Sequence, residues 1–327
     1  MTQVIEISWV TFMFLFGGYY MKIIGKSAPR DAELRSKIDC TKYIEIHLNE
    51  KDIDVQSMFE VITKQSKIDI QYVHSHLFSS RCVKNISSTN LEYLGDFYIK
   101  GYLEKAMELA QKLSEFYNHT IGVVVHTGFD YTKYEVMGGL LYGITSAVDE
   151  LLNIYTNVYL CIENVPYVSG NLSSDLGVIF RSGGFDDNVK LCNYLREALP
   201  HNSNRLFTVL DTCHALASVQ ILRVFNSNIK DEEYMDKLFE LNSKTAKLIH
   251  MADVKNFGIT KSNHGIVFDD DRKHIMQFFM SCYKKNNLTA DITLEIQESD
   301  YSISDNFRHN SRMLKEICSD LSLSMDF

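Results

Sequence analysis

The sequence has few of the residues that build linkers. Its 327 residues include only three prolines, and no low-complexity stretch interrupts them. Long linkers are usually rich in proline, glycine or serine, so these absences argue against loosely joined domains. No shift in composition marks a domain boundary. We therefore expect residues 21–327 to form one domain, with an apolar content of 45% that supports a sizeable core.

A hydrophobic run long enough to span a bilayer is also missing. The apolar run at 9–16 has eight residues, whereas a transmembrane helix needs about 20. The residues before it carry Glu6 and no lysine or arginine, and no A-x-A-like cleavage site follows, unlike a signal peptide. Met21 directly precedes the first expected strand. We interpret residues 1–20 as an N-terminal extension upstream of the natural start, with a short amphiphilic anchor as the alternative.

Cysteines at metal-binding or redox spacing are absent. The seven cysteines are scattered and form no CxxC pair. Such usage is typical of free thiols in a reducing compartment, so we expect a cytoplasmic protein.

Excess positive charge is absent too. The net charge is −9 and the pI about 5.7, which gives no polybasic footprint for nucleic acid. A local basic rim would still permit docking, because the local field decides it. Bound cations would offset part of the acidity.

The most informative pattern is a residue of metal-ligand type where each of six apolar runs stops. The spacing between these residues is 37 to 52 positions, about the length of one βα unit. They are His74, His126, Glu163, Asp211, His250 and Glu295.

Strand-like and helix-like segments alternate along the chain. Runs such as VYLCI and GVVV are continuously apolar, as in parallel strands that are buried on both faces. The expected strands cover 22–26, 43–48, 68–74, 121–126, 157–163, 205–211, 246–251 and 290–296. The expected helices cover 30–38, 54–65, 90–117, 137–154, 187–199, 215–225, 231–243, 271–286 and 303–322. A long loop rich in glycine and serine is expected at 164–186. Eight repeats predict a (β/α)8 TIM barrel, whose active site lies at the carboxyl ends of its strands.

Each ligand-type residue alone is weak evidence, because a histidine that ends a strand is often structural and an acidic residue often caps a helix. Together they would converge on one cleft. Three carboxylates there would repel one another, and a divalent cation would remove that cost. Histidine and carboxylate ligands without thiolate suit Zn²⁺ or Mn²⁺. Two further histidines, His214 and His264, are candidates for a third metal or for substrate contact.

Short motifs in the same places resemble the endonuclease IV type of AP endonuclease, within the xylose-isomerase-like superfamily. They are LDTCHA (210–215), IHMADVK (249–255), VVHTG (124–128), IEN (162–164) and LEI (294–296), and the resemblance runs from about residue 22 to 300. It implies a hydrolase of DNA repair that cuts damaged DNA at abasic sites. It also implies three zinc ions.

The resemblance assigns His74 and His126 to the first ion, and Glu163 bridges it to the second. Asp211, His250 and Glu295 complete the second ion, and Glu163 and Glu295 would act in catalysis. His214 and His264 would hold the third ion together with an aspartate, but Ser262 stands where that aspartate is expected. The first motif also lacks the usual HxxY, and HPG is replaced by HTG. Substrate contacts are expected from Asn164, Lys255 and Lys261, with Arg181 as a further phosphate contact.

Two alternatives stay open. Sugar or sugar-phosphate isomerases and epimerases of the same superfamily use one metal, Mn²⁺ for example, held by residues matching Glu163, Asp211, His250 and Glu295. In these enzymes the two glutamates exchange a proton with substrate carbon. A barrel that binds a ligand without chemistry is the third hypothesis. His74 and His126 favour the hydrolase, whereas Ser262 and the acidic balance favour the isomerase.

Overall fold

The computed structural model describes ten stretches of the chain, and the structural statements below concern these residues. They are 20–39, 41–49, 52, 54–75, 100–126, 134–165, 187–225, 228–254, 265–298 and 303–327. Residues 1–19 of the proposed N-terminal extension and residues 166–186 of the expected 164–186 loop therefore lie outside them.

Eight parallel strands close into a barrel. They are β1 (Met21–Ser27), β2 (Tyr43–His47), β3 (Asp69–His74), β4 (Ile121–His126), β5 (Val158–Glu163), β6 (Leu206–Asp211), β7 (Ala246–Met251) and β8 (Asp291–Leu294). Each strand pairs with the next in sequence order, and β1 pairs with both β2 and β8, which closes the ring. This confirms the predicted (β/α)8 fold.

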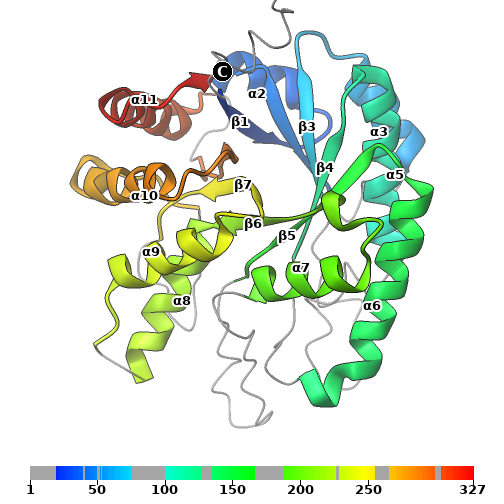
Figure 1. Ribbon diagram of the computed structural model, residues 1–327. Helices are drawn as coiled ribbons and strands as arrows, with labels where there is room; N and C mark the ends of the chain where they lie inside the picture. Colours follow the sequence, from blue (N-terminus) through cyan, green and yellow to red (C-terminus); the bar gives the residue numbers. More distant parts are fainter. Residues whose placement is uncertain are drawn as a thin grey trace, which may run out of the picture.

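Helices lie outside the strands (Figure 1). They are α2 (Ala32–Asp39), α3 (Val55–Thr63), α5 (Lys100–Tyr117), α6 (Tyr134–Ile154), α7 (Asp187–Ala198), α8 (Thr212–Phe225), α9 (Asp231–Asn242), α10 (Lys273–Lys285) and α11 (Asp305–Asp320). Two 3-10 turns are η2 (Ser203–Arg205) and η3 (Asp270–Arg272). The boundaries lie within a few residues of those expected, except that residues 90–99 of the expected 90–117 helix are not among the described residues.

Two features differ from the expected layout. Strand β8 ends at Leu294, so Glu295 is the first residue of the loop. A short strand β9 (Met325–Asp326) follows α11 and adds to β1 in parallel, beyond the last expected helix at 303–322, where no strand was expected. The pairing places the end of the chain beside the start of the barrel, as Figure 1 shows.

The apolar strand residues divide between two environments. Some point outward and pack under the helices in two large clusters, whereas others fill the barrel interior. Tyr72 and Tyr159 meet edge to face inside the barrel, with ring centroids 6.1 Å apart. Gly122 on β4 leaves the space for them, because a Cβ there would lie 2.6 Å from Tyr72 and 2.7 Å from Tyr159. A packed interior of this kind supports the ligand row at the strand ends.

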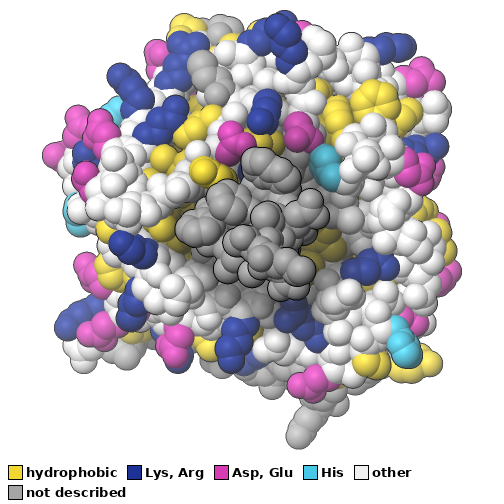
Figure 2. All heavy atoms as spheres, turned by 45° about the horizontal axis from the view of Figure 1, so that its top comes forward, with side chains coloured by type: hydrophobic (Ala, Val, Ile, Leu, Met, Phe, Trp, Pro, Cys, Tyr) yellow, Lys and Arg dark blue, Asp and Glu magenta, His cyan; other side chains and the backbone are white. Residues whose placement is uncertain are grey.

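The five cysteines among the described residues are buried and free, as the absence of CxxC pairs predicts. No helix in the described stretches is both long enough and apolar enough to cross a membrane. Figure 2 shows one face of the molecule, which includes the upper side of Figure 1. Lysine, arginine, aspartate and glutamate side chains alternate over the described part of this face.

Candidate metal centre

Six strand ends bring the predicted ligands together inside the barrel mouth. His74, His126, Glu163 and Asp211 are the last residues of their strands, His250 lies one residue before the end of β7, and Glu295 directly follows β8. Five of the six are at most 4% exposed, and Glu295 is partly exposed. Their ligand atoms form two groups, each with all atoms within 4.8 Å of one another: His74, His126 and Glu163, and then Glu163, Asp211, His250 and Glu295.

Glu163 belongs to both groups and directs a different oxygen to each. Its Oε2 lies 3.1 Å from Nε2 of His74 and 3.3 Å from Nε2 of His126. Its Oε1 lies 3.2 Å from Nδ1 of His250. A carboxylate placed in this way has the arrangement of a bridge between two cations.

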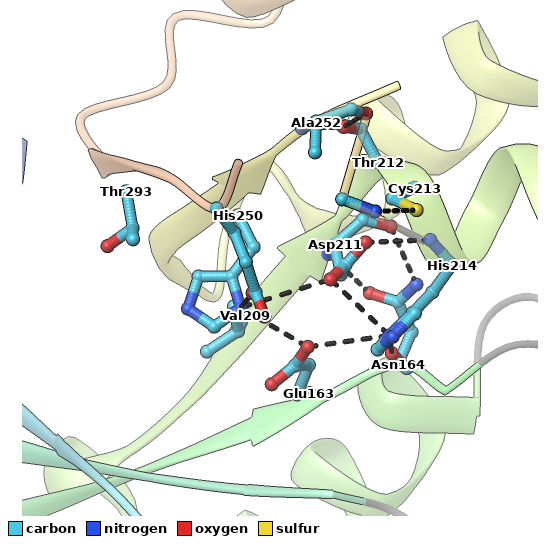
Figure 3. Close-up of polar contacts among 12 residues, drawn as sticks. Glu163, Asn164, Val209, Asp211, Thr212, Cys213, His214, His250, Ala252 and Thr293 are labelled. Carbon is cyan, nitrogen blue, oxygen red and sulfur yellow. Dashed lines mark hydrogen bonds and ion pairs between the residues drawn. The ribbon is translucent and has the colours of Figure 1, made fainter. Parts of the chain in front are cut away.

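The second group is centred on Nδ1 of His250. This nitrogen lies 3.0 Å from Oε2 of Glu295 and 4.0 Å from Oδ2 of Asp211, in addition to its contact with Glu163. Figure 3 shows Glu163, Asp211 and His250 converging from three neighbouring strands. One nitrogen therefore faces three carboxylates, which together would surround a single cation.

Burial and charge set the protonation of this centre. Burial lowers the pKa of His250, but the carboxylates of Glu45 and Glu163 outweigh burial and raise that pKa well above its ordinary value. Burial raises the pKa of Glu163, but the neighbouring His250 and His126 outweigh it, so the carboxyl group is ionised. Burial lowers the pKa of His74, and the charge of Lys26 lowers it further. In the metal-free protein, a protonated His250 supplies positive charge where the carboxylates meet.

The residues present fit a divalent metal. Both groups combine imidazole nitrogen with carboxylate oxygen and contain no thiolate, a set that suits zinc or manganese. The buried carboxylates would otherwise have to be balanced by protons. The identity of the ion is not fixed by this donor set.

Asn164 and His214 lie next to the centre and make backbone contacts. The Asn164 amide donates from Nδ2 to the carbonyl of Asp211 at 3.0 Å, and its Oδ1 accepts from the Asp211 amide at 2.7 Å. His214 Nδ1 lies 2.7 Å from the carbonyl of Asn164 and 3.4 Å from Oε1 of Glu163. Both amide atoms of Asn164 are thus used to hold the ends of β5 and β6 in register, and its contact with substrate stays a prediction.

Asp211 also begins the following helix. Its Oδ1 accepts a hydrogen bond from the backbone amide of His214 at 2.7 Å, which satisfies one of the free donors at the start of α8. Its Oδ2 faces His214 at 3.5 Å and His250 at 4.0 Å. The D-x-x-H spacing therefore combines a helix cap with a ligand position.

Sequence reasoning missed two ionisable residues inside the barrel. Lys26 on β1 lies 2.8 Å from Oε1 of Glu295 and 3.6 Å from Oε1 of Glu45. Burial lowers the pKa of Lys26, but Glu295 and Glu45 outweigh burial and raise it, so the amine is charged. Glu45 on β2 is fully buried. The available signal was a charged residue inside a mostly apolar strand, Glu45 in β2 and Lys26, in addition to Lys22, in β1.

A cavity of about 230 Å³ lies beside Glu295, at the ends of β1, β2 and β8. Its polar lining includes Lys26, Arg35, His47, Asn49 and Gln297. The His47 ring meets that of His74 edge to face, with centroids 5.1 Å apart. Glu295, the partly exposed ligand, therefore lines this cavity and also belongs to the second ligand group.

Several expected site residues lie outside the described residues. They are His264, Ser262, Lys255, Lys261 and Arg181. The third metal group and the phosphate contacts therefore stay predictions.

Neither the protein-family models nor the curated proteins gave a match to this chain. The chain is similar to a number of solved structures. An AP endonuclease, family 2, from Brucella melitensis is 8% identical, with 89% of this chain and 98% of that chain covered, at a TM-score of 0.56. A D-allulose 3-epimerase from Methylomonas sp. is 12% identical, with 92% and 99% covered, at a TM-score of 0.54. An L-ribulose 3-epimerase is 11% identical, with 93% and 97% covered, at a TM-score of 0.53.

At these identities the likeness concerns the fold, and the neighbours include an enzyme named for DNA and enzymes named for sugars. They do not separate the two activities. The chain has the (β/α)8 TIM-barrel fold that these solved structures share.

Proposed function

We propose that the protein is a metal-dependent phosphodiesterase that incises DNA at abasic sites. The position of Glu163 carries this proposal. One oxygen faces His74 and His126, and the other faces His250. A single-metal isomerase needs only the second group, so two buried histidines on the far side of Glu163 point to a second cation.

His74 and His126 with Glu163, and Asp211, His250 and Glu295 with the same Glu163, would hold the zinc ions. Clustered zinc ions lower the pKa of a water molecule, polarise the phosphate and stabilise the leaving oxygen. We assign Glu163 and Glu295 to hold the attacking water. Asp211 and His250 shape the second group, and Asn164 fixes Asp211 by its backbone. Water would add to phosphorus as the P–O bond to the leaving oxygen breaks.

Substrate binding would use the loops that follow the strands. A duplex would be gripped at its phosphates and the abasic nucleotide turned out toward the barrel mouth. Lys255, Lys261 and Arg181 are the cations that we assign to phosphate contact. Such contacts make binding weaken steeply as salt concentration rises.

A single-metal sugar or sugar-phosphate epimerase is the second candidate. The observation in its favour is that Glu163, Asp211, His250 and Glu295 form a complete four-ligand group by themselves. Glu163 and Glu295 would then exchange a proton with substrate carbon. This enzyme would hold one ion, and His74 and His126 would contact the substrate.

An incision assay tests the first proposal. The substrate is a duplex oligonucleotide with one stable abasic analogue, and the protein is supplied with Zn²⁺. We expect strand cleavage at the analogue, loss of cleavage with chelator, and loss in Glu163→Gln. Asp69→Asn is the matched control, because it also changes an acid to its amide but lies at the start of β3. Epimerisation of a ketose with Mn²⁺, without DNA cleavage, would overturn the proposal in favour of the second candidate.

A further inference from the structure

A buried carboxylate lies behind His250, on the side away from the proposed metals. Glu45 Oε2 lies 3.0 Å from Nε2 of His250 and accepts a hydrogen bond from Thr293 Oγ1 at 2.7 Å. Lys26 lies 3.6 Å from the other oxygen. Glu45 and His250 are both fully buried.

The two nitrogens of His250 therefore have different partners. Nε2 faces Glu45, whereas Nδ1 faces Glu163 at 3.2 Å and Glu295 at 3.0 Å. An ionised carboxylate can only accept, so in the metal-free protein, where His250 is protonated, Nε2 donates to Glu45 and Nδ1 donates toward Glu163 and Glu295. A cation held by the second group would take the place of the Nδ1 proton and leave the Nε2 proton on the Glu45 side, because a histidine that binds metal commonly donates its other N–H to a carboxylate.

We propose that Glu45 is a positioning residue that fixes His250 with Nε2 protonated and Nδ1 presented to the metal centre. This inference rests on the proposed metal site. In the proposed arrangement Glu45 contacts neither substrate nor metal. Lys26 connects Glu45 to Glu295, so the same buried network also orients a second ligand.

A second possible metal position competes with this arrangement. Ligand atoms of Glu45, His74 and His250 also lie within 4.8 Å of one another. A metal bound there would require Nε2 of His250 to lose its proton, and Glu45 would be a ligand instead of a positioning residue. The protonated nitrogen of His250 distinguishes the two arrangements directly.

The experiment combines zinc affinity with the ¹⁵N spectrum of the histidine side chains, using the full chain. Zinc affinity is measured by competition with a chelator for wild type, Glu45→Gln and Asp69→Asn. We expect Glu45→Gln to weaken zinc binding about 10- to 100-fold, the range for lost partners of metal-binding histidines. Asp69→Asn, at the opposite end of the barrel, should match wild type within about 2-fold, the scatter expected of a distant surface change. Melting curves establish that both variants are folded.

The spectrum is recorded on wild type with and without zinc. We expect His250 to keep its Nε2 proton in both states and Nδ1 to carry the zinc in the loaded state. Zinc on Nε2, an unprotonated Nε2 in the metal-free protein, or wild-type affinity in folded Glu45→Gln would overturn the proposal. Wild type that binds no zinc would contradict the proposed function instead. In that case a metal-free spectrum with an unprotonated Nε2 would still overturn the proposed contact with Glu45.

Discussion

Nε2 of His74 lies 3.1 Å from Oε2 of Glu163, where the two ligand groups meet. Because Glu163 is shared, its loss should affect both groups at once. Zinc at about 100 times its Kd adds about 2.7 kcal/mol to the stability of a protein that binds it only when folded. We expect a zinc-dependent rise in melting temperature for wild type and little or none for Glu163→Gln at the same zinc concentration. An equal rise in both proteins would exclude Glu163 as a ligand.

Gly122 lies in a tightly packed part of the barrel interior. A Cβ at this position would lie 2.6 Å from the Tyr72 ring and 2.7 Å from the Tyr159 ring, both inside the barrel. Overpacking of this kind costs about 1–3 kcal/mol. Gly122→Ala should therefore lower the free energy of unfolding by that amount in urea titration.

Gly143→Ala is the matched control, because nothing lies within 4 Å of the added Cβ on α6. An exposed helical glycine replaced by alanine gains up to about 1 kcal/mol. The two variants should shift the unfolding midpoint in opposite directions. Equal midpoints would contradict the packing described around Tyr72 and Tyr159.

An ion pair joins Asp253, which follows β7, to Arg272 at the end of η3. Arg272 contacts both oxygens of the fully buried Asp253, with Nε at 2.7 Å and Nη2 at 2.6 Å. Arg272→Met leaves this carboxylate uncompensated, a change that costs about 3–5 kcal/mol at buried pairs. Because Arg272 is partly exposed, we expect the lower end of that range. Asp253→Asn combined with Arg272→Met should recover part of the loss, whereas strict additivity of the two changes would argue against the pair.

The free energy of unfolding is expected to depend on pH through a contact at the end of the barrel opposite the ligand groups. The hydrogen bond to Asp69, 2.7 Å from His119 Nε2, raises the pKa of His119 above its ordinary value. The stability that this interaction contributes is fully present below the unfolded pKa, about 6.5, and falls as pH rises through the folded pKa. Wild type should therefore exceed Asp69→Asn in unfolding free energy by more at pH 6 than at pH 9. A His119 pKa that NMR titration finds equal in both proteins would contradict this.

Much of the fold and the ligand row could be predicted from local sequence. Continuously apolar strands and the recurrence of ligand-type residues predict the barrel, because parallel strands of this length place their carboxyl ends together. His74, Asp211 and His250 follow from that rule. Strand β9 could not be predicted in this way, since its two residues pair with β1 from the other end of the chain.

Glu45 and Lys26 were missed for a different reason. Each lies inside a mostly apolar strand, where a charged residue does not reveal whether it faces the barrel interior or the helices. Only the register between β1, β2 and β8 places Lys26 between Glu45 and Glu295. The sequence also did not reveal that both amide atoms of Asn164 contact the backbone of Asp211, and the expected contact of Asn164 with substrate stays a prediction.

Metal content tests the central claim most directly. Zinc and manganese are quantified on protein purified without a metal-binding tag, for wild type and for His74→Ala, which removes a ligand from the first group only. A binuclear centre joined by Glu163 predicts at least two zinc ions per chain in wild type and one fewer in His74→Ala. A single exchangeable manganese ion that persists unchanged in His74→Ala would contradict the account.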